Sequence, residues 1–422
     1  MPRPLRIVFF NRSYWPDMAA TGQYLTELAQ DLAGRHGCEV TVVAGQPLTV
    51  SAVRSRAIFS RETRNGVHIL RANGTHFRPR RFAGRAANYL TYFASAALAS
   101  LFVRRPDVVV SLTDPPIVGL LALATARRTG AKFAFWCNDI FPEVAMLLED
   151  FQSGIVNTGL DRINRSLISH ADLIVSIGNR MKRRLVEEKG ADASRVETIH
   201  YWADCEAISP TPRDNAFARA NGLVDKFVVM HSGNVGASQN LEMIVEAADR
   251  LKGRPDIVFA IVGDGVKRPS LASMAEARGL TNVRFFPYQP KESLDQSFGT
   301  ADVFVVSLKA GIEGYIVPSK LYGTLAAGRP YIAAVDASAE PAEVAREHRC
   351  GLLVTPGDVD GFTAAIARLK DDPEECAAMG RRAREAAWLF DRRRAVLTYY
   401  NAFAHLAKGA DASPSASPVG AR

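Results

Sequence analysis

The feature that most restricts the fold of this chain is an alternation of short apolar runs with helical patterns, which occurs once in each half. In the first half, apolar runs that predict strands lie at residues 7–10, 40–44, 108–111, 133–136 and 173–176. In the second half, such runs lie at residues 227–231, 257–262, 283–286, 303–306 and 331–334. Strands separated by helices are typical of parallel, doubly wound α/β domains. We therefore predict two such domains facing a central cleft, because ligands of these sheets bind beyond the carboxyl ends of the strands.

Length and local composition suggest where the domains begin and end. A chain of 422 residues exceeds one typical core and fits two domains. A polar segment with two prolines separates the two alternating halves, and the last residues are rich in Ala, Ser and Pro. We predict an N-terminal domain at 1–204, a linker at 205–224, a C-terminal domain at 225–390, a helix at 391–408 that packs back on the N-terminal domain, and a disordered tail at 409–422.

The start of the chain and its cysteines indicate the cellular compartment. Met1–Leu5 leads directly into a strand-like run, which is not the pattern of a secretory signal. The five cysteines lack CxxC spacing, which argues against a zinc site and a disulfide framework; they are Cys38, Cys137, Cys205, Cys350 and Cys376. We expect a protein of the reducing cytoplasm with no metal and no cofactor.

Positive charge is concentrated in one part of the chain. The formal net charge is +8, yet residues 53–105 hold eleven arginines and a single acid, Glu62. Within this block, residues 86–103 are uncharged and rich in Ala and Ser, and they fall short of the roughly 20 apolar residues of a spanning helix. The stretch is either a buried core helix or a helix that docks the protein on an anionic membrane surface, peripherally. No nucleic-acid recognition motif accompanies the arginines, so we expect no nucleic-acid partner.

Glycine turns follow three of the predicted strands. Gly22 begins the helix after the first strand, and Ser232–Gly236 and Val262–Gly265 follow two strands of the second half. Glycine lets the backbone approach a ligand closely, but it also serves ordinary turns between a strand and a helix. None of the turns has the full GxGxxG spacing, which argues against NAD.

Cations and one helix start in the second half are suited to a bound anion. Pro318-Ser319-Lys320 stands where a helix begins, and the free N–H groups and the macrodipole of a helix start favour negative charge. Lys267 and Arg268 follow the third glycine turn. Together with Lys320 they could neutralise a diphosphate without a metal, or each could be a solvated surface charge.

The order of several segments resembles a known enzyme family. "HSGNVG", "IVGDG", "FFPYQP", "EGYIVPSKLYGTLAAGRP" and "CGLLVTPGD" resemble the C-terminal domain of family 4-type GT-B glycosyltransferases. "YWPDMAATGQYLTELAQDLAGRHGCEVTVVAG" and "CNDIFPEV" resemble the acceptor domain of that family. The similarity spans residues 5–405 and extends to the bacterial colanic-acid and O-antigen transferases, which include N-acetylfucosamine transferases. It implies the GT-B fold, with two Rossmann-like domains.

The resemblance implies a nucleotide-sugar donor, and we expect a UDP-sugar. The diphosphate would lie at the helix start of 318–320, opposite Gly233 and Asn234, and the base would meet the backbone at Tyr288 and Gln289, unless these two residues are a plain strand exit. The donor-binding residues that we expect are Gly22, Gly233, Asn234, Lys267, Arg268, Tyr288, Gln289, Pro318, Ser319 and Lys320. Glu313 resembles the first motif glutamate of the family, which binds hydroxyls of the transferred sugar.

Two positions depart from the family pattern. The family usually has a second glutamate, eight residues after the first, that holds the ribose, but this chain has Leu321 there and Gly323 at the nearest alternative position. Many relatives also have histidine before the aspartate of the "CNDIFPEV" segment, where this chain has Asn138. We expect Asp139 and Glu313 to be catalytic and Asp17, Asn138 and Glu143 to lie on the acceptor side. Asp139 and Glu143 could instead cap the helix after Pro142.

Family membership implies transfer with retention, in which the leaving diphosphate helps to take the acceptor proton and no enzyme nucleophile is needed. Catalysis then consists of positioning and of stabilising charge on the diphosphate. The chain has no DxD motif in a suitable loop, so we predict no metal. The basic block suits a lipid-linked (polyprenyl diphosphate) saccharide acceptor at a membrane. The alternatives are a nucleotide-sugar 2-epimerase on the same fold and a non-catalytic lectin-like or scaffold protein.

Overall fold

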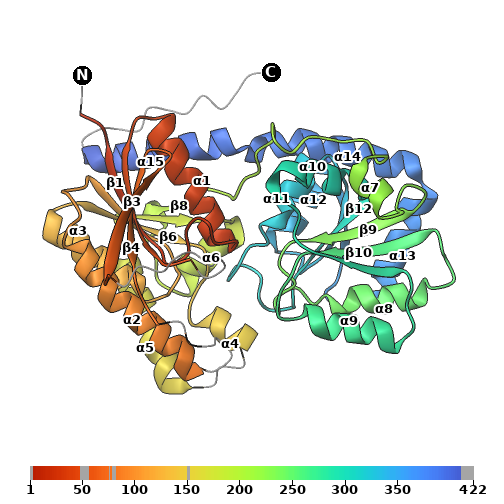
Figure 1. The fold of residues 1–422 in the computed structure, drawn as a ribbon, viewed down its shortest axis with the longest axis horizontal. Helices are drawn as coiled ribbons and strands as arrows, with labels where there is room; N and C mark the ends of the chain where they lie inside the picture. The colour runs from red at the N-terminus through yellow and green to blue at the C-terminus, as the bar shows by residue number, and fades with distance from the viewer. Residues whose placement is uncertain (1–2, 48–56, 76, 78–81, 150–152, 410–422) are drawn as a thin grey trace.

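The computed structural model describes residues 3–47, 57–75, 77, 82–149 and 153–409, and Figure 1 shows two α/β lobes. The N-terminal lobe is built on a sheet of eight strands in the order β3-β4-β2-β1-β5-β6-β7-β8. Neighbouring strands are parallel except β3, which is antiparallel to β4. The strands are β1 (Arg6–Phe10), β2 (Glu39–Gly45), β3 (Phe59–Arg64), β4 (Val67–Ala72), β5 (Val108–Ser111), β6 (Lys132–Cys137), β7 (Leu173–Ser176) and β8 (Val196–Thr198).

Helices connect these strands and cover both faces of the sheet. They are α1 (Ala20–Gly34), α2 (Phe82–Ser100), α3 (Val118–Thr129), α4 (Glu143–Glu149), α5 (Gly154–His170), α6 (Asn179–Glu187) and the 3₁₀ turn η1 (Ala193–Arg195). The central strand β5 is buried along its whole length, as expected for a parallel sheet that is covered on both faces.

The C-terminal lobe repeats this architecture with a parallel six-stranded sheet in the order β11-β10-β9-β12-β13-β14. Its strands are β9 (Phe227–Ser232), β10 (Ile257–Val262), β11 (Val283–Phe286), β12 (Val303–Ser307), β13 (Tyr331–Ala334) and β14 (Gly351–Val354). Its helices are α7 (Ala216–Ala220), α8 (Glu242–Arg250), α9 (Arg268–Ala277), η2 (Lys291–Ser293), α10 (Leu294–Thr300), α11 (Lys320–Ala326), α12 (Glu340–His348), α13 (Val359–Asp371), α14 (Pro373–Ala387) and η3 (Trp388–Phe390).

The fold class predicted from the alternation is confirmed, and every expected strand is present. The hairpin of β3 and β4 was not predicted. Its turn is Asn65-Gly66, with φ angles of 48° and 78°, and this pair of residues is a strong hairpin signal because both positions need positive φ.

Two segments cross between the lobes. The segment expected as a linker contains α7 and packs on the C-terminal lobe, since Arg213 pairs with Asp302 at 2.9 Å. The last helix, α15 (Arg392–Lys408), lies along the N-terminal lobe (Figure 1). Its Phe403 meets Phe9 of β1 edge to face at 6.1 Å between ring centroids. The predicted tail falls almost entirely on residues 410–422, outside the described part of the chain.

The uncharged stretch of the basic block forms most of α2, which is only partly buried. Tyr92, Ala96 and Ala99 face the core, whereas Leu90 is 61% and Leu98 46% exposed. The helix is therefore amphipathic, with one side in the core of the N-terminal lobe and the other side exposed, so the choice between a buried core helix and a membrane-docking helix stays a prediction. Among the described residues, no helix is long and apolar enough to cross a membrane.

The arginines around α2 have different surroundings. Arg71 is buried, with 3% exposure, and donates to Glu62 at 2.7 Å and to the carbonyl of Gly45 at 3.2 Å, so it is a structural residue. Arg61 lies 5.2 Å from the ring of Phe102, measured to the centroid. The remaining candidates in the preceding loops, Arg54, Arg56, Arg78, Arg80 and Arg81, lie outside the described residues.

Candidate active site

The carboxyl ends of the two sheets are joined by direct contacts. Ile140, just after β6, donates its backbone N–H to the carbonyl of Tyr315 at 3.0 Å. Glu27 on α1 pairs with Lys291 of η2, which follows β11, at 2.8 Å. We call the region where residues 139–140 meet residues 313–315 the interdomain junction. It brings the loops that contain Asp139 and Glu313 together, as a site shared by both domains requires.

Lys320, the first residue of α11, lies beside the first glycine turn of the C-terminal lobe. Its Nζ is 3.4 and 3.5 Å from the two ring nitrogens of His231, and a Cβ placed on Gly233 would be 3.8 Å from its Cε. Burial lowers the pKa of Lys320 to about 7, and burial together with the charge of Lys320 lowers the pKa of His231 well below its usual value. Over the described residues, no carboxylate lies within ion-pair distance of Lys320. An anionic ligand would supply the missing counter-charge.

The two glycines of the third turn are required by its packing against the second turn. A Cβ on Gly263 would lie 1.9 Å from the carbonyl oxygen of Gly233, and a Cβ on Gly265 would lie 2.4 Å from that of Val235. Both glycines have φ angles that other residues rarely adopt, 134° and 156°. The two turns therefore form one tightly packed unit, in which Asn234 is exposed.

Four other predicted donor residues already have partners within the lobe. Lys267 pairs with Glu242 at 2.7 Å, and Arg268 donates to the carbonyl of Gly263 at 2.9 Å. Tyr288 is 41% exposed and donates its hydroxyl to the carbonyl of Asp264 at 3.2 Å. The amide of Gln289 donates to the carbonyl of Pro287. Of the predicted cations, Lys320 is therefore the one whose charge is not balanced by a carboxylate or bound by a carbonyl.

The helix start itself is a weaker feature than the sequence suggested. Pro318 is buried, and Ser319 makes no side-chain cap to the helix. Helix α11 has seven residues, so its dipole is small, and Lys320 supplies most of the positive potential at this point.

The two positions at which a second glutamate was sought, residues 321 and 323, are packed against the core of the C-terminal lobe. Leu321 is completely buried, and a Cβ on Gly323 would lie 3.0 Å from Cε2 of Phe298. Phe298 in turn packs edge to face on Phe304 of β12, with 5.3 Å between centroids. A side chain at residue 323 would press against this aromatic pair, so the packing gives a reason for glycine at this position.

Glu313 lies at the interdomain junction and is bound by the opposite lobe. Its side chain is 12% exposed, and Oε1 is 3.4 Å from Nη2 of Arg184 on α6. Oε2 is buried and has no hydrogen-bond partner. Arg184 was not singled out from the sequence, because nothing in its local pattern shows that it reaches the other domain.

Asp139 lies just after β6, in a polar cluster at the carboxyl ends of β1, β5 and β6. Thr113 donates its hydroxyl to Oδ2 of Asp139 at 3.3 Å. Burial raises the pKa of Asp139 to about 6; Asp114 adds to the rise, while the hydrogen bond from Thr113 opposes it. Asp114 itself is paired with Arg12 at 3.3 Å. One carboxylate of the cluster is thus neutralised, and Asp139 is left half-buried with no cation paired to it among the described residues.

The three acceptor-side candidates are buried or paired within the N-terminal lobe. Asn138 is 2% exposed and donates its amide to the hydroxyl of Tyr201 at 2.9 Å. Glu143, in the first turn of α4, accepts a hydrogen bond of 2.6 Å from Lys189, whose side chain is 1% exposed, and so balances a buried charge. Asp17 is 6% exposed.

Gly22 belongs to the packing of the N-terminal lobe. A Cβ there would lie 3.1 Å from the backbone carbon of Ser13. This contact gives Gly22 a reason to be glycine that does not involve a ligand, and its donor role stays a prediction.

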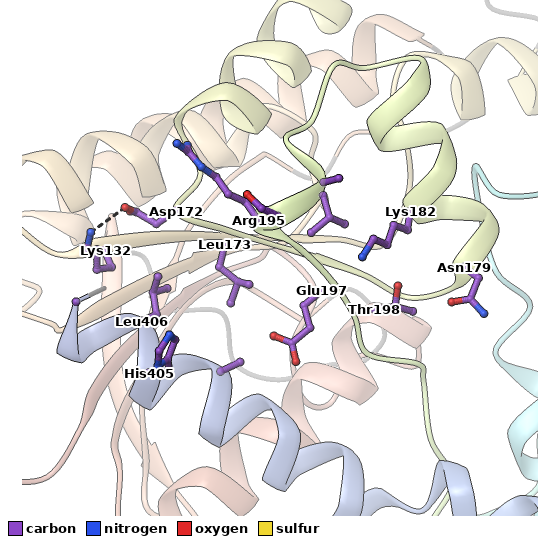
Figure 2. Close-up of a pocket in the computed structure, with 15 residues that line it drawn as sticks. Lys132, Asp172, Leu173, Asn179, Lys182, Arg195, Glu197, Thr198, His405 and Leu406 are labelled. Carbon is purple, nitrogen blue, oxygen red and sulfur yellow. Dashed lines mark hydrogen bonds and ion pairs between the residues drawn. The ribbon is translucent and has the colours of Figure 1, made fainter. Parts of the chain in front are cut away.

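Two further observations limit where chemistry takes place. The described residues contain no group of three or more His, Cys, Asp or Glu side chains that could hold a metal ion. A cavity of about 870 Å³ lies on the N-terminal lobe between β8, α6 and α15, where Figure 2 shows Lys182, Glu197 and His405 on its walls. None of the predicted site residues lines this cavity, whereas Asp139 and Glu313 lie at the interdomain junction, which is therefore the candidate active site.

Comparison with known proteins agrees with this two-lobed arrangement. Residues 213–386 match the family described as "Glycosyl transferases group 1", and residues 20–202 match the "Glycosyl transferase 4-like domain". A probable glycosyltransferase, WbjE of Pseudomonas aeruginosa, is 31% identical over 294 residues, which are 68% of this chain and 71% of WbjE. The chain belongs to the family 4 GT-B glycosyltransferases.

Other relatives support the same assignment. The putative colanic acid biosynthesis glycosyl transferase WcaI of Escherichia coli K12 is 26% identical over 376 residues, 86% of this chain and 91% of WcaI. The crystal structure of Anabaena Alr3699/HepE in complex with UDP matches with a TM-score of 0.72 and 15% identity, over 95% of this chain and 100% of HepE, which supports the fold. The protein is therefore a glycosyltransferase, and the 2-epimerase alternative is not favoured.

Proposed function

We propose that the enzyme transfers a sugar, with retention, from a UDP-sugar to a lipid-linked saccharide acceptor during cell-surface polysaccharide synthesis. The observation that carries the proposal is Lys320, a cation without a carboxylate partner in the described chain, beside Gly233 and His231. A diphosphate is the anion that a nucleotide-sugar enzyme would place there. The structural neighbour HepE is a complex with UDP, which supports a uridine nucleotide as the donor.

The donor side of the mechanism is charge stabilisation. When the bond from the sugar to the diphosphate breaks, negative charge grows on the leaving oxygen, and a cation held in place beforehand lowers the barrier. Lys320 would supply this charge in a half-buried site, where it is screened less than in water. Exposed Asn234 lies at the same turn and would contact the diphosphate or the sugar.

The acceptor side depends on Asp139. With a pKa raised to about 6 by burial, Asp139 is ionised at neutral pH and can accept a hydrogen bond from an acceptor hydroxyl. In a front-face reaction the hydroxyl attacks the side of the anomeric carbon that the diphosphate leaves. The hydroxyl proton passes to the leaving diphosphate, while Asp139 orients the hydroxyl.

A membrane position would bring a lipid-linked acceptor to the N-terminal lobe. Helix α2 exposes Leu90 and Leu98, and Phe77 before it is 57% exposed, within the block that holds eleven arginines. Apolar side chains combined with basic residues are typical of surfaces that bind anionic lipid reversibly. We therefore propose peripheral binding to the cytoplasmic face of the membrane.

A thermal-shift screen of nucleoside diphosphates and nucleotide sugars, with EDTA present, tests the donor proposal. A ligand that binds only the folded protein raises its melting temperature. We expect UDP and UDP-sugars to stabilise the enzyme in the presence of EDTA. Stabilisation that requires Mg²⁺ or Mn²⁺, or that is confined to nucleotides with other bases, would contradict the proposed donor site.

A further inference from the structure

The loop from Glu313 to Tyr315 belongs to the C-terminal lobe, and side chains of the N-terminal lobe bind it. Arg184 of α6 donates Nε to the backbone carbonyl of Glu313 at 2.7 Å. The ring of Tyr315 lies under the same guanidinium, 3.8 Å from its central carbon to the ring centroid. The hydroxyl of Tyr315 donates to Glu188 at 2.9 Å. One arginine therefore holds both ends of this three-residue loop.

Arg184 is fixed by its surroundings before it contacts the loop. It is 8% exposed, and its Nη1 is paired with Glu188 at 2.7 Å, one helical turn away. The rigid fork of a guanidinium can then bind the main chain and the carboxylate of Glu313 together. Gly314 allows this close approach, because a Cβ there would lie 3.0 Å from Nε of Arg184 and its φ is 78°.

Only one oxygen of the Glu313 carboxylate has a polar partner. Oε1 is 3.4 Å from Arg184, whereas Oε2 is buried without any hydrogen-bond partner. A buried carboxylate oxygen without a partner costs stability unless a ligand donates to it. A sugar hydroxyl is such a donor, and it would arrive with the nucleotide sugar at this junction.

We infer that Arg184 is a positioning residue, which orients the Glu313 carboxylate so that its free oxygen receives a hydroxyl of the donor sugar. The inference rests on the proposed function, since it requires a nucleotide-sugar donor at the interdomain junction. It adds that the acceptor-binding lobe builds part of the sugar site. The sugar contact forms only while α6 and the 313–315 loop are together, and the nucleotide contacts at Lys320 do not depend on that pairing.

Calorimetric titration of UDP and of UDP-glucose, UDP-galactose and UDP-N-acetylglucosamine separates these two contributions. For each variant, the quantity of interest is the ratio of the Kd for UDP to the Kd for the tightest UDP-sugar. We expect Arg184→Gln to lower this ratio about tenfold, because a charge-assisted contact is lost, while the Kd for UDP stays within about twofold. A merely structural role would weaken UDP and UDP-sugars alike.

Two further variants make the test specific. Arg183→Gln is the matched control, since Arg183 pairs with Glu343 of the other lobe at 3.3 Å, is exposed, and is not bound to Glu313. It should leave the ratio unchanged. Arg184→Lys keeps the charge without the fork, should fold if Arg184→Gln does not, and should give an intermediate ratio. Adding Arg184→Gln to Glu313→Gln should cause no further loss.

The outcomes distinguish this inference from the proposed function. If the wild-type enzyme binds the UDP-sugars and both Arg184 variants keep the full ratio, or if the Arg184 and Glu313 effects add, the inference is wrong and the proposed donor stands. If the wild-type enzyme binds neither UDP nor any of the three UDP-sugars, the proposed donor is wrong and the inference is overturned with it.

Discussion

Replacing Lys320 by Ala tests the proposed diphosphate contact quantitatively. A charge-assisted hydrogen bond to a phosphate contributes about 1.5–3 kcal/mol, and about 1.4 kcal/mol corresponds to a tenfold change in Kd. We therefore expect Lys320→Ala to raise the Kd for UDP by about one to two orders of magnitude at pH 6.5, with the fold intact. The assay is calorimetric titration with UDP in EDTA.

The pH dependence of the Kd for UDP provides a second, independent test of the contact. Because burial lowers the pKa of Lys320 to about 7, the free enzyme loses this charge as the pH rises through 7. A bound diphosphate stabilises the protonated form, so binding takes up a proton above pH 7 and the wild-type Kd should rise by up to tenfold per pH unit. Lys320→Ala should lack this rise.

The lowered pKa of Lys320 also predicts how the stability of the ligand-free enzyme changes with pH. Between pH 7 and the usual lysine pKa of 10.5, the unfolded chain binds more protons at Lys320 than the folded chain does. Stability from this group therefore increases with pH across that window, and Lys320→Ala should remove the increase. Lys252→Ala is the matched control, because Lys252 is an exposed lysine that pairs with Asp249 and is not among the expected site residues. An unchanged Kd for UDP in Lys320→Ala, or a wild-type pH profile that the variant reproduces, would refute the diphosphate contact.

Three other predictions follow from named contacts. Asp139→Asn should lower kcat by about two orders of magnitude, because the acceptor hydroxyl is no longer oriented. It should also abolish the acid limb of the kcat/KM profile, which in the wild type should rise as Asp139 of the free enzyme ionises through pH 6; a retained limb would assign the titration to another group. Gly263→Ala should lower the urea concentration at the unfolding midpoint, because its Cβ would meet the Gly233 carbonyl at 1.9 Å. Gly253, which is exposed and has no atom within 4 Å of a Cβ placed on it, should tolerate Ala as a control. Equal unfolding midpoints for the two variants would contradict the close packing of the turns. Changing Arg78, Arg80, Arg81 and Arg85 together to Gln should reduce both the salt-sensitive flotation of the protein with anionic vesicles and the transfer of sugar to a lipid acceptor, with the Kd for UDP unchanged. A wild-type protein that does not float with the vesicles at low salt would contradict the proposed membrane binding.

The fold was accessible from the sequence because its signals are local. Buried parallel strands such as β5 and β10 are continuous apolar runs, and such runs are visible without any knowledge of partners. The β3–β4 hairpin was missed although Asn65-Gly66 marks it, because both strands are polar on their exposed sides and lack an apolar run. Short strands at the sheet edges, such as β8, carry too few residues for a pattern.

The site was only partly accessible, because its chemistry depends on contacts between distant residues. Lys320 and Glu313 stand in a recognisable motif, and His231 directly precedes the glycine turn of residues 232–236. The pairing of Arg184 with Glu313 links residues 129 positions apart, which no local pattern records. The same holds for Lys189, whose burial makes Glu143 a structural partner.

The most direct test of the central claim is product analysis of a single reaction run in EDTA, with and without a polyprenyl diphosphate-linked saccharide acceptor. The donor is the UDP-sugar that stabilises the enzyme most in the thermal-shift screen, and the products are assigned by mass spectrometry and by the anomeric proton signal in NMR. We expect the lipid-linked saccharide to gain one sugar with the anomeric configuration of the donor. Without acceptor, the donor sugar should stay unaltered apart from slow hydrolysis. Transfer with inversion, a strict metal requirement, or conversion of the donor sugar to its 2-epimer without acceptor would contradict the proposed function.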